Sequence, residues 1–170
     1  MAGVLNQNMF SLRKLGLLLL VVILTVLIPT LSHADYTWTE QTSAGSRYWI
    51  SIASSSDGSK LAGITGGSGT TKYIYTSTDS GSTWTEQTGA GSRSWRSITS
   101  SSDGSKLAAV VGTSGYIYTS TNSGSTWTEQ TGAGSRNWYG IASSSDGSKL
   151  AAVAYGGYIY TSTNSGSTWT

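Results

Sequence analysis

Residues 77–84 read STDSGSTW, and near copies of this octapeptide, STNSGSTW, recur at 120–127 and 162–169. The tryptophans that close the three copies stand at 84, 127 and 169, and a partial copy, TWTEQT, places another at 38. Successive tryptophans are therefore 46, 43 and 42 residues apart. A repeat period in the low forties is typical of one supersecondary unit copied in tandem. The octapeptide thus predicts the organisation of the chain before it predicts any chemistry.

Each copy of the unit contains four strand-like segments. In the third copy they are 138–143, 149–154, 158–162 and the segment that begins at 169. Between the first two lies SSSDGS, whose Asp-Gly pair supplies the positive φ of a tight hairpin turn. Four short antiparallel strands in a unit of this length are what a β-propeller blade requires. The sequence therefore predicts an all-β chain of tandem four-stranded blades of the β-propeller type.

The octapeptide joins the third and fourth strands of each unit and has the composition of a tight turn. We expect the Asp79 side chain to accept hydrogen bonds from backbone N–H groups two or three residues further on. Gly81 is free to take a conformation that is closed to other residues, and Trp84 returns to anchor the hairpin on apolar neighbours. Asn122 and Asn164 stand in place of the aspartate and keep an acceptor through their amide oxygen. The change from Asp to Asn should therefore keep the turn and lose only the charge.

The pattern S-x-D-x-G-x-T-W resembles the Asp-box, or BNR repeat, of sialidases and of many other bacterial propeller proteins. Three copies in register extend over the chain from residue 35 onward, and two of them depart from the family pattern by having Asn for Asp. The resemblance implies that the box is a structural turn on the rim of the propeller, away from the ligand site. The structural residues that it assigns are Ser77, Asp79, Gly81, Thr83, Trp84, Ser120, Asn122, Gly124, Thr126, Trp127, Ser162, Asn164, Gly166, Thr168 and Trp169.

Composition argues against several classes of function. Cysteine is absent, and the single histidine, His33, lies before residue 35. From residue 35 onward the numbers of basic and acidic residues are equal, and a neutral domain has no electrostatic footprint for nucleic acid. Without His or Cys, this part of the chain lacks the usual metal ligands, general base and nucleophile pairs. We therefore expect no metal, no cofactor and no nucleic-acid partner.

Residues 1–34 have the three-part layout of a secretory signal peptide. A basic pair at 13–14 precedes the apolar run 15–28, and 32–34 places small residues at −3 and −1 of a cleavage point. We expect cleavage after Ala34 and a secreted or periplasmic protein that keeps no stable membrane anchor. The alternative is an uncleaved anchor, although the run is shorter than the roughly 18–20 apolar residues that span a bilayer.

Catalysis is not expected of this chain. The resemblance implies that an active sialidase would use an arginine cluster, a Tyr/Glu nucleophile pair, an acidic Asp and an early Arg-Ile-Pro segment. Proline occurs only at Pro29, so that segment is missing. Carboxylates recur instead at the same place in each copy, as Glu40, Glu86 and Glu129 do in WTEQT. An active site needs unlike groups at one point, so we expect no catalytic residues.

Binding is the expected role. In a propeller, the loop that leads into the first strand and the loop between the second and third strands open on the same face. The first loop carries a repeated Arg and Trp, which would suit sugars or acidic groups, and the second loop varies most among the copies. The alternative is structural, with Arg capping loop carbonyls and Trp packing between blades. The candidate ligand-binding residues are Arg47, Trp49, Arg93, Trp95, Arg136 and Trp138.

The number of blades raises a further question. Blade repeats occupy approximately 47–88, 93–131 and 136–170, and 36–42 supplies an extra copy of the fourth strand. Propellers usually close with four to eight blades, so we expect the domain at 35–170 to form an incomplete ring as a monomer. The extra strand could pair with the last blade of another chain. We therefore expect self-association that completes a ring.

The sequence thus predicts a secreted, non-catalytic binding or scaffold module whose ligand is a carbohydrate or a protein partner. Two alternatives stay open. One is a fragment of a sialidase-like carbohydrate-active enzyme. The other is a relative of the photosystem assembly factors of the Ycf48 kind, which resemble Asp-box propellers and use arginines for partner contact.

Overall fold

The computed structural model describes residues 37–67 and 72–170, so the expected signal peptide at 1–34 lies outside the described residues. The chain divides into two compact units, Met1–Thr39 and Glu40–Thr170. All strands of the described chain belong to the second unit. No helix among the described residues is long and apolar enough to cross a bilayer.

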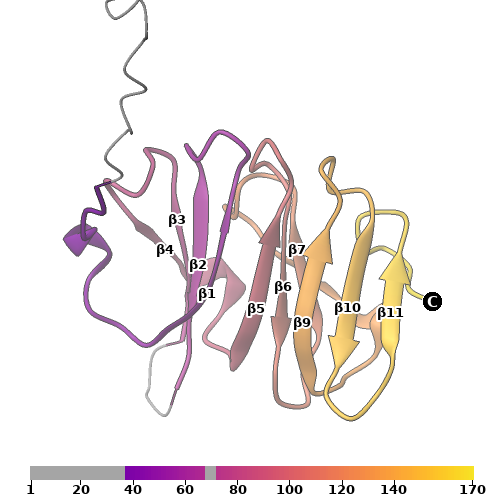
Figure 1. Ribbon diagram of the computed structural model, residues 1–170. Helices are drawn as coiled ribbons and strands as arrows, with labels where there is room; N and C mark the ends of the chain where they lie inside the picture. The colour runs from indigo at the N-terminus through magenta and orange to yellow at the C-terminus, as the bar shows by residue number, and fades with distance from the viewer. Residues whose placement is uncertain (1–36, 68–71) are drawn as a thin grey trace, which may run out of the picture. The chain divides into compact units, whose positions relative to one another are not determined.

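Three antiparallel sheets follow one another along the second unit, and each of them is one blade (Figure 1). Blade 1 has the strand order β1-β2-β3-β4, blade 2 has β5-β6-β7-β8, and blade 3 has β11-β10-β9. The bounds are β1 (Trp49–Ser54), β2 (Leu61–Thr65), β3 (Ile74–Ser77), β4 (Thr85–Gln87), β5 (Trp95–Ser100), β6 (Leu107–Val111), β7 (Ile117–Ser120), β8 (Thr128–Gln130), β9 (Trp138–Ser143), β10 (Leu150–Ala154) and β11 (Ile159–Ser162). The expected all-β fold of tandem propeller-type blades is confirmed.

A short 3₁₀ turn precedes the first strand of each blade. These turns are η1 (Thr42–Ala44), η2 (Thr88–Ala90) and η3 (Thr131–Ala133). The strand expected at 36–42 does not form, since residues 37–41 have no regular structure and η1 begins at Thr42. In blades 1 and 2 the same TEQ sequence forms β4 and β8 by pairing with the third strand of its own blade. Within the described chain, the TEQ segment ahead of blade 1 has no third strand beside it. A single strand without a neighbour makes no backbone hydrogen-bond ladder, so the segment does not form a strand.

The core lies between neighbouring blades. One cluster of buried side chains joins blades 1 and 2, and a second cluster joins blades 2 and 3. Blade 2 is therefore covered on both faces, and its second strand β6, LAAVV, is buried along its whole length. A strand buried on both faces has a continuous apolar sequence without alternation. The repeat unit is thus stabilised chiefly by the blade next to it.

The octapeptide forms the turn between the third and fourth strands. Asp79 Oδ1 accepts hydrogen bonds from the Thr83 N–H at 2.9 Å and from the Ser77 hydroxyl at 2.8 Å. Gly81, at φ +90°, donates its N–H to Ser77 Oγ at 2.9 Å, and the Trp84 indole N–H donates to the Gly81 carbonyl at 3.0 Å. The expected turn forms, but Asp79 accepts the backbone N–H of the residue four positions on and not two or three. The N–H of Gly81, two positions on, donates instead to Ser77 Oγ.

The two later copies keep this geometry with asparagine. Asn122 Oδ1 accepts from the Thr126 N–H at 2.9 Å, and its amide group donates to the Thr126 hydroxyl at 2.9 Å. Asn164 makes the same two bonds to Thr168 at the same distances. An amide can therefore replace the carboxylate without losing a partner.

We expect Asp79→Ala to lower the urea midpoint of unfolding, because three donors lose their acceptor: the N–H and the hydroxyl of Thr83 and the hydroxyl of Ser77. Asp79→Asn should leave the midpoint nearly unchanged. Hydrogen bonds from Thr83 and Ser77 lower the pKa of Asp79 to about 2. A carboxylate whose pKa is lowered by folding stabilises the fold at a pH above its ordinary pKa of 3.8. That contribution is lost as the pH falls through the lowered pKa. Urea titrations at about pH 7 and about pH 2 should therefore show a larger acid-induced decrease for the wild type than for Asp79→Asn. An asparagine variant as unstable as the alanine variant would show that the charge itself is required.

Candidate binding site

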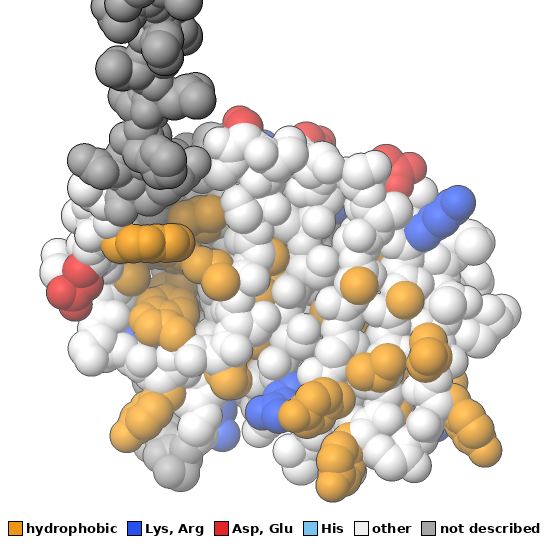
Figure 2. Space-filling model, in the orientation of Figure 1, with side chains coloured by type: hydrophobic (Ala, Val, Ile, Leu, Met, Phe, Trp, Pro, Cys, Tyr) orange, Lys and Arg blue, Asp and Glu red, His pale blue; other side chains and the backbone are white. Residues whose placement is uncertain are grey.

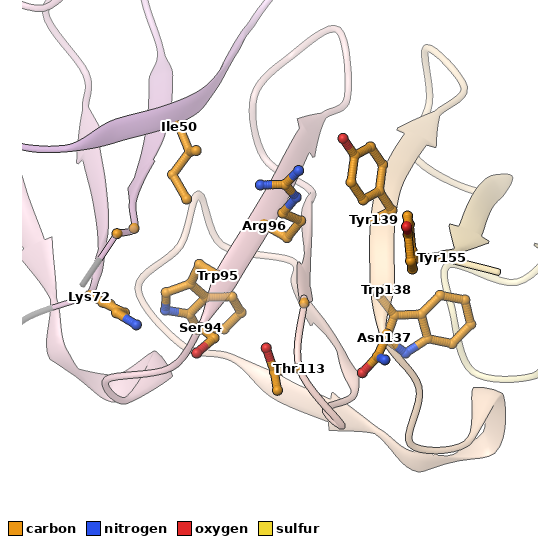
Figure 3. A pocket seen from close by; sticks show the side chains of 13 residues that line it. Ile50, Lys72, Ser94, Trp95, Arg96, Thr113, Asn137, Trp138, Tyr139 and Tyr155 are labelled. Carbon is orange, nitrogen blue, oxygen red and sulfur yellow. The ribbon is translucent and has the colours of Figure 1, made fainter. Parts of the chain in front are cut away.

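A pocket of about 410 Å³ opens beside the first strands of the blades (Figure 3). It lies at the end where the loops that lead into β1, β5 and β9 meet the loops between the second and third strands. The octapeptide turns and the Asp-Gly turns lie at the opposite end of the strands, where they bond to one another, as the Ser80 N–H does to the Ser59 carbonyl at 2.9 Å. Figure 2 shows acidic side chains along the upper edge and at the left side of the view, and hydrophobic side chains both along the lower part and at the upper left. The pocket is therefore remote from the repeated turns.

A β-bulge in the first strand of each blade brings one side chain to this pocket. The pairing of the first and second strands skips one residue, which leaves Ile50, Arg96 and Tyr139 without a partner opposite. A bulge bends the strand and changes the direction of the side chain at that point. These three residues occupy the same position of the repeat, yet one is apolar, one is cationic and one is aromatic. The bulges thus bring unlike side chains together.

Glycines behind two of the bulges make room for these side chains. A Cβ atom at Gly66 would lie 1.9 Å from Ile50 Cδ1. A Cβ atom at Gly112 would lie 3.2 Å from Arg96 Cβ. The corresponding residue of blade 3 is Tyr155, which adds a side chain to the pocket where the other blades have none.

A guanidinium group and two rings form one wall of the pocket (Figure 3). The guanidinium carbon of Arg96 lies 4.3 Å from the centre of the Tyr139 ring. The rings of Tyr139 and Tyr155 are 6.1 Å apart and tilted by 36°, and both side chains are exposed. Asn137, on another side of the pocket, is held in place because its Oδ1 accepts the Ser114 N–H at 2.9 Å. The pocket therefore offers charge, ring faces and a fixed polar group.

The charge of the pocket is positive. Arg96 and Lys72 line it, and none of its described lining residues is acidic. Of the carboxylates, Glu86 lies on the outer strand of blade 1, where it accepts the Tyr75 hydroxyl at 2.5 Å; burial and this bond raise the pKa of Tyr75 to about 12. In the described part of the chain no group of three or more His, Cys, Asp or Glu side chains could hold a metal ion. The arrangement can bind an anionic or aromatic group.

The three repeated arginines are not among the side chains that line the pocket. Arg47, Arg93 and Arg136 each donate the Nε–H to the carbonyl of the alanine that ends the preceding 3₁₀ turn, at 3.1, 3.0 and 3.0 Å. Each guanidinium carbon also lies over a tyrosine ring of its own blade, at 4.7, 4.5 and 4.4 Å from the ring centre. These contacts match the structural alternative, in which arginine caps loop carbonyls. Ligand binding by these arginines stays a prediction.

The three repeated tryptophans differ in their surroundings. Trp95 and Trp138 are 2% and 1% exposed, because each packs against the preceding blade and only borders the pocket. Trp49, the same residue of blade 1, is 37% exposed. The burial of Trp95 and Trp138 between blades matches the structural alternative. Ligand binding by the repeated tryptophans stays a prediction.

The sequence prediction followed the residues that the copies share and so missed Ile50, Arg96 and Tyr139. The signal for these three is present in the sequence, because the residues directly before and directly after each repeated tryptophan differ in every copy. Shared residues hold the shared structure, whereas a binding site for one ligand must use positions that differ. The two loops expected to form a common face do meet at the pocket.

No protein-family model and no curated protein matches the chain by sequence. Solved β-propeller structures do resemble it. The chain is similar to the GH74 enzyme of Niastella koreensis, with 25% identity and a TM-score of 0.56 over 72% of this chain and 17% of that one. It is similar to Ycf48 bound to D1 peptide, with 17% identity and a TM-score of 0.57 over 73% of this chain and 40% of that one. It is also similar to a chain of the nidogen/laminin complex, with 15% identity and a TM-score of 0.61 over 73% and 47%.

The chain spans less than half the length of each of these proteins. At such identities the likeness establishes the β-propeller fold and says nothing of a shared ligand or reaction. Enzymes and proteins solved with a bound partner both occur among the similar structures.

Proposed function

We propose that this chain is a secreted or periplasmic, non-catalytic binding module of the Asp-box propeller class. The observation that carries the proposal is the meeting of Ile50, Arg96 and Tyr139 in one pocket. Blades that are otherwise nearly identical differ at this point, as a site for a single ligand requires. The repeated Ser-Asx-Gly-Thr-Trp turn, in which the glycine N–H donates to the serine hydroxyl in all three copies, supports the Asp-box assignment.

The pocket favours a ligand that joins an anionic group to a flat or apolar part. Arg96 can bind a carboxylate through two parallel hydrogen bonds, and Lys72 adds a second positive charge. Tyr139 and Tyr155 present exposed rings on which a sugar ring or an aromatic side chain can stack. The volume suits a small part of a larger molecule. The ligand of the proposal is therefore an acidic carbohydrate or an acidic segment of a protein partner.

The similar structures support both classes of ligand. Ycf48 is bound to a D1 peptide, and another similar chain belongs to the nidogen/laminin complex. A GH74 xyloglucanase from Xanthomonas campestris is also similar, at 16% identity. A relative of Ycf48 and a fragment of a carbohydrate-active enzyme thus stay as alternatives.

The charge of the pocket argues for binding without catalysis. Most glycoside hydrolases use a pair of carboxyl groups on either side of the bond that is cleaved. None of the described pocket residues has a carboxyl group. Glu86 and Glu129, repeated on the outer strands, instead accept hydrogen bonds from the Tyr75 and Tyr118 hydroxyls.

An array that carries acidic and neutral glycans together with acidic and neutral peptides tests the proposal. We expect the protein to retain anionic probes, and Arg96→Ala to weaken that binding by about tenfold or more, because a charged hydrogen bond is lost. Arg96→Lys should retain part of the affinity, since the charge stays and the planar fork is lost. Lys60→Ala, at the opposite end of the strands, removes the same charge and should bind like the wild type.

Two results would contradict this function. If Arg96→Ala binds anionic probes as tightly as the wild type and has the same urea midpoint, the ligand does not bind in this pocket. Release of reducing sugar from a glycan probe would show catalysis. The proposal also includes the self-association expected from the sequence, because three blades are fewer than propellers usually need.

A further inference from the structure

The largest differences among the three copies surround the repeated tryptophan. Outside the loop between the second and third strands, three positions carry a different residue in every copy. At the other end of the strands, the SSSDGS turns are identical and the octapeptides differ only in Asp or Asn. The three variable positions stand before the tryptophan (Tyr48, Ser94, Asn137), after it (Ile50, Arg96, Tyr139) and opposite it in the strand ladder (Thr65, Val111, Ala154).

The two positions beside the tryptophan can reach a ligand. All three residues after the tryptophan and two of the three before it line the pocket. The third residue before it, Tyr48, is 76% exposed and lies against the pocket lining, since a Cβ atom at Gly67 would be 3.3 Å from Tyr48 Cγ. The position opposite the tryptophan is buried in blades 1 and 2. Each blade therefore presents one variable pair, and the pairs are Tyr48 with Ile50, Ser94 with Arg96, and Asn137 with Tyr139.

The variable pair of blade 1 is apolar. Tyr48 and Ile50 are 76% and 41% exposed. Ile50 lies over Gly66, where a Cβ atom would be 1.9 Å from its Cδ1, so the glycine gives the isoleucine its place beside the pocket. Exposed apolar surface at the edge of a pocket favours an apolar group of the ligand.

The variable pair of blade 2 is cationic. Among the described residues none accepts a hydrogen bond from the Arg96 guanidinium, which lies over the Tyr139 ring, whereas the three repeated arginines all donate to alanine carbonyls. Lys72 lies nearby, because its backbone carbonyl accepts the N–H of the residue before Ser94 at 3.2 Å. Figure 3 shows Lys72 and Arg96 on either side of Trp95. This pair favours a carboxylate.

The variable pair of blade 3 combines a ring with a fixed amide. Asn137 Oδ1 accepts the Ser114 N–H at 2.9 Å, which directs the amide N–H groups of Asn137 elsewhere and leaves them for a ligand. Ser114 has a φ of +44°, and Gly115 next to it exchanges two backbone hydrogen bonds with Arg136, at 3.1 and 2.9 Å. A backbone held in such a conformation is often part of a functional site. The pair offers the Tyr139 ring for stacking and the amide for a carbonyl.

We propose that the ligand is an extended peptide segment and that the variable pair of each blade binds one of its side chains. Blade 1 binds an apolar residue, blade 2 an acidic residue and blade 3 an aromatic residue. Neighbouring sheets pack about 10 Å apart and an extended chain advances about 3.4 Å per residue, so the three bound residues are about three positions apart. The inference rests on the proposed function and narrows its ligand to the peptide class.

Unlike pairs in successive blades favour a peptide over an acidic glycan. A polysaccharide of one repeated acidic sugar presents the same groups to every blade, so three like pairs would match it best. A peptide presents a different side chain at each step, as the three pairs do. Tyrosine, serine and asparagine, which occur in these pairs, are also enriched in antibody binding loops, where tyrosine supplies contact area at a low cost in conformational entropy.

A positional library of extended peptides of about ten residues, blocked at both ends, tests the proposal. We expect the wild type to select Asp or Glu at one position, an apolar residue about three positions to one side and an aromatic residue about three positions to the other. Arg96→Glu should replace the acidic preference by one for Lys or Arg, a change of about tenfold or more, at that position alone. Lys149→Glu reverses the charge of an exposed residue at the opposite end of the strands and should select like the wild type.

Two smaller substitutions test the assignment of residues to blades. Tyr139→Ala should remove the preference at the aromatic position only, and Ile50→Ala the preference at the apolar position only. Both side chains are exposed, so we expect both variants to keep the wild-type circular dichroism spectrum. Preferences that change at several positions at once would refute separate binding by each blade.

Binding of an oligogalacturonate distinguishes a failure of this inference from a failure of the proposed function. If the wild type binds it, Arg96→Ala weakens that binding and no library position shows a preference, the ligand is a glycan and the peptide proposal is wrong, while the proposed function stands. The same residue class selected at all three positions would also overturn the proposal. If the wild type binds neither the oligogalacturonate nor any acidic peptide, both the proposed function and this inference are wrong.

Discussion

Replacing Trp95 by alanine is expected to lower the free energy of unfolding by about 3–5 kcal/mol. The indole is 2% exposed and belongs to the cluster that joins blades 1 and 2. Its ring stands edge-on to that of Tyr118, with centres 5.2 Å apart and planes at 77°. Trp95 lies on β5, which a backbone ladder joins to β6, and β1 and β2 of the facing blade are joined by a ladder of their own, so we expect the two sheets to resist closing over the missing ring. The truncated side chain therefore leaves a cavity between the blades, and urea titration followed by circular dichroism measures its cost.

Trp95→Phe is the matched control. Phenylalanine keeps a ring edge against Tyr118 and removes the indole N–H, which is buried without a partner in the described chain. An unsatisfied buried donor is itself unfavourable, so we expect less than half the loss seen with alanine. Equal losses for the two variants would show that the size of the ring does not hold the blades together.

The strand pattern could be predicted from the sequence because local chemistry decides it. The segments expected at 138–143, 149–154 and 158–162 differ by at most one residue from β9, β10 and β11. Asp-Gly pairs and the octapeptide fix the turns with their own side chains, and the apolar runs between them fit only strands. The strand expected at 36–42 failed for a physical reason. Its sequence equals that of β4 and β8, but a strand also needs a neighbour, which a local sequence cannot report.

The pocket could be predicted only in part. The order of strands in a blade predicted that the loop before the first strand and the loop between the second and third strands lie on the same face, and both loops do line the pocket. The candidate residues were chosen because they repeat, as Arg47 and Trp95 do, whereas Arg96 and Tyr139 line the pocket at a position that differs among the copies. Repetition marks what every blade needs for its own stability, as the bond from Arg47 to the Ala44 carbonyl does. The bulge that brings Arg96 to the pocket is a shift in strand register, and register follows from how two strands pair.

Gly124→Ala is expected to lower the free energy of unfolding by about 2–4 kcal/mol, in two parts. Gly124 has a φ of +90°, which an L-residue with a Cβ atom adopts only at a cost. The added Cβ would also lie 2.9 Å from Thr76 Cγ2 of the preceding blade. Thr76 is buried and its hydroxyl is held by the Gln87 side chain, so it cannot turn away without losing that bond. The octapeptide glycine is thus constrained both by its own turn and by the packing of neighbouring blades.

Two further variants separate these parts. Gly81→Ala places the same substitution at the same φ of +90°, but its Cβ would meet Leu61 Cδ1 only at 3.3 Å, so we expect the backbone part alone, about 1–2 kcal/mol. Combining Gly124→Ala with Thr76→Ser removes the obstructing methyl group and keeps the hydroxyl that Gln87 binds. The double variant should therefore lose no more than Gly81→Ala, measured by urea titration relative to Thr76→Ser. If Gly81→Ala and Gly124→Ala cost the same, the turn alone requires glycine, and the contact between the octapeptide and the preceding blade contributes nothing to stability.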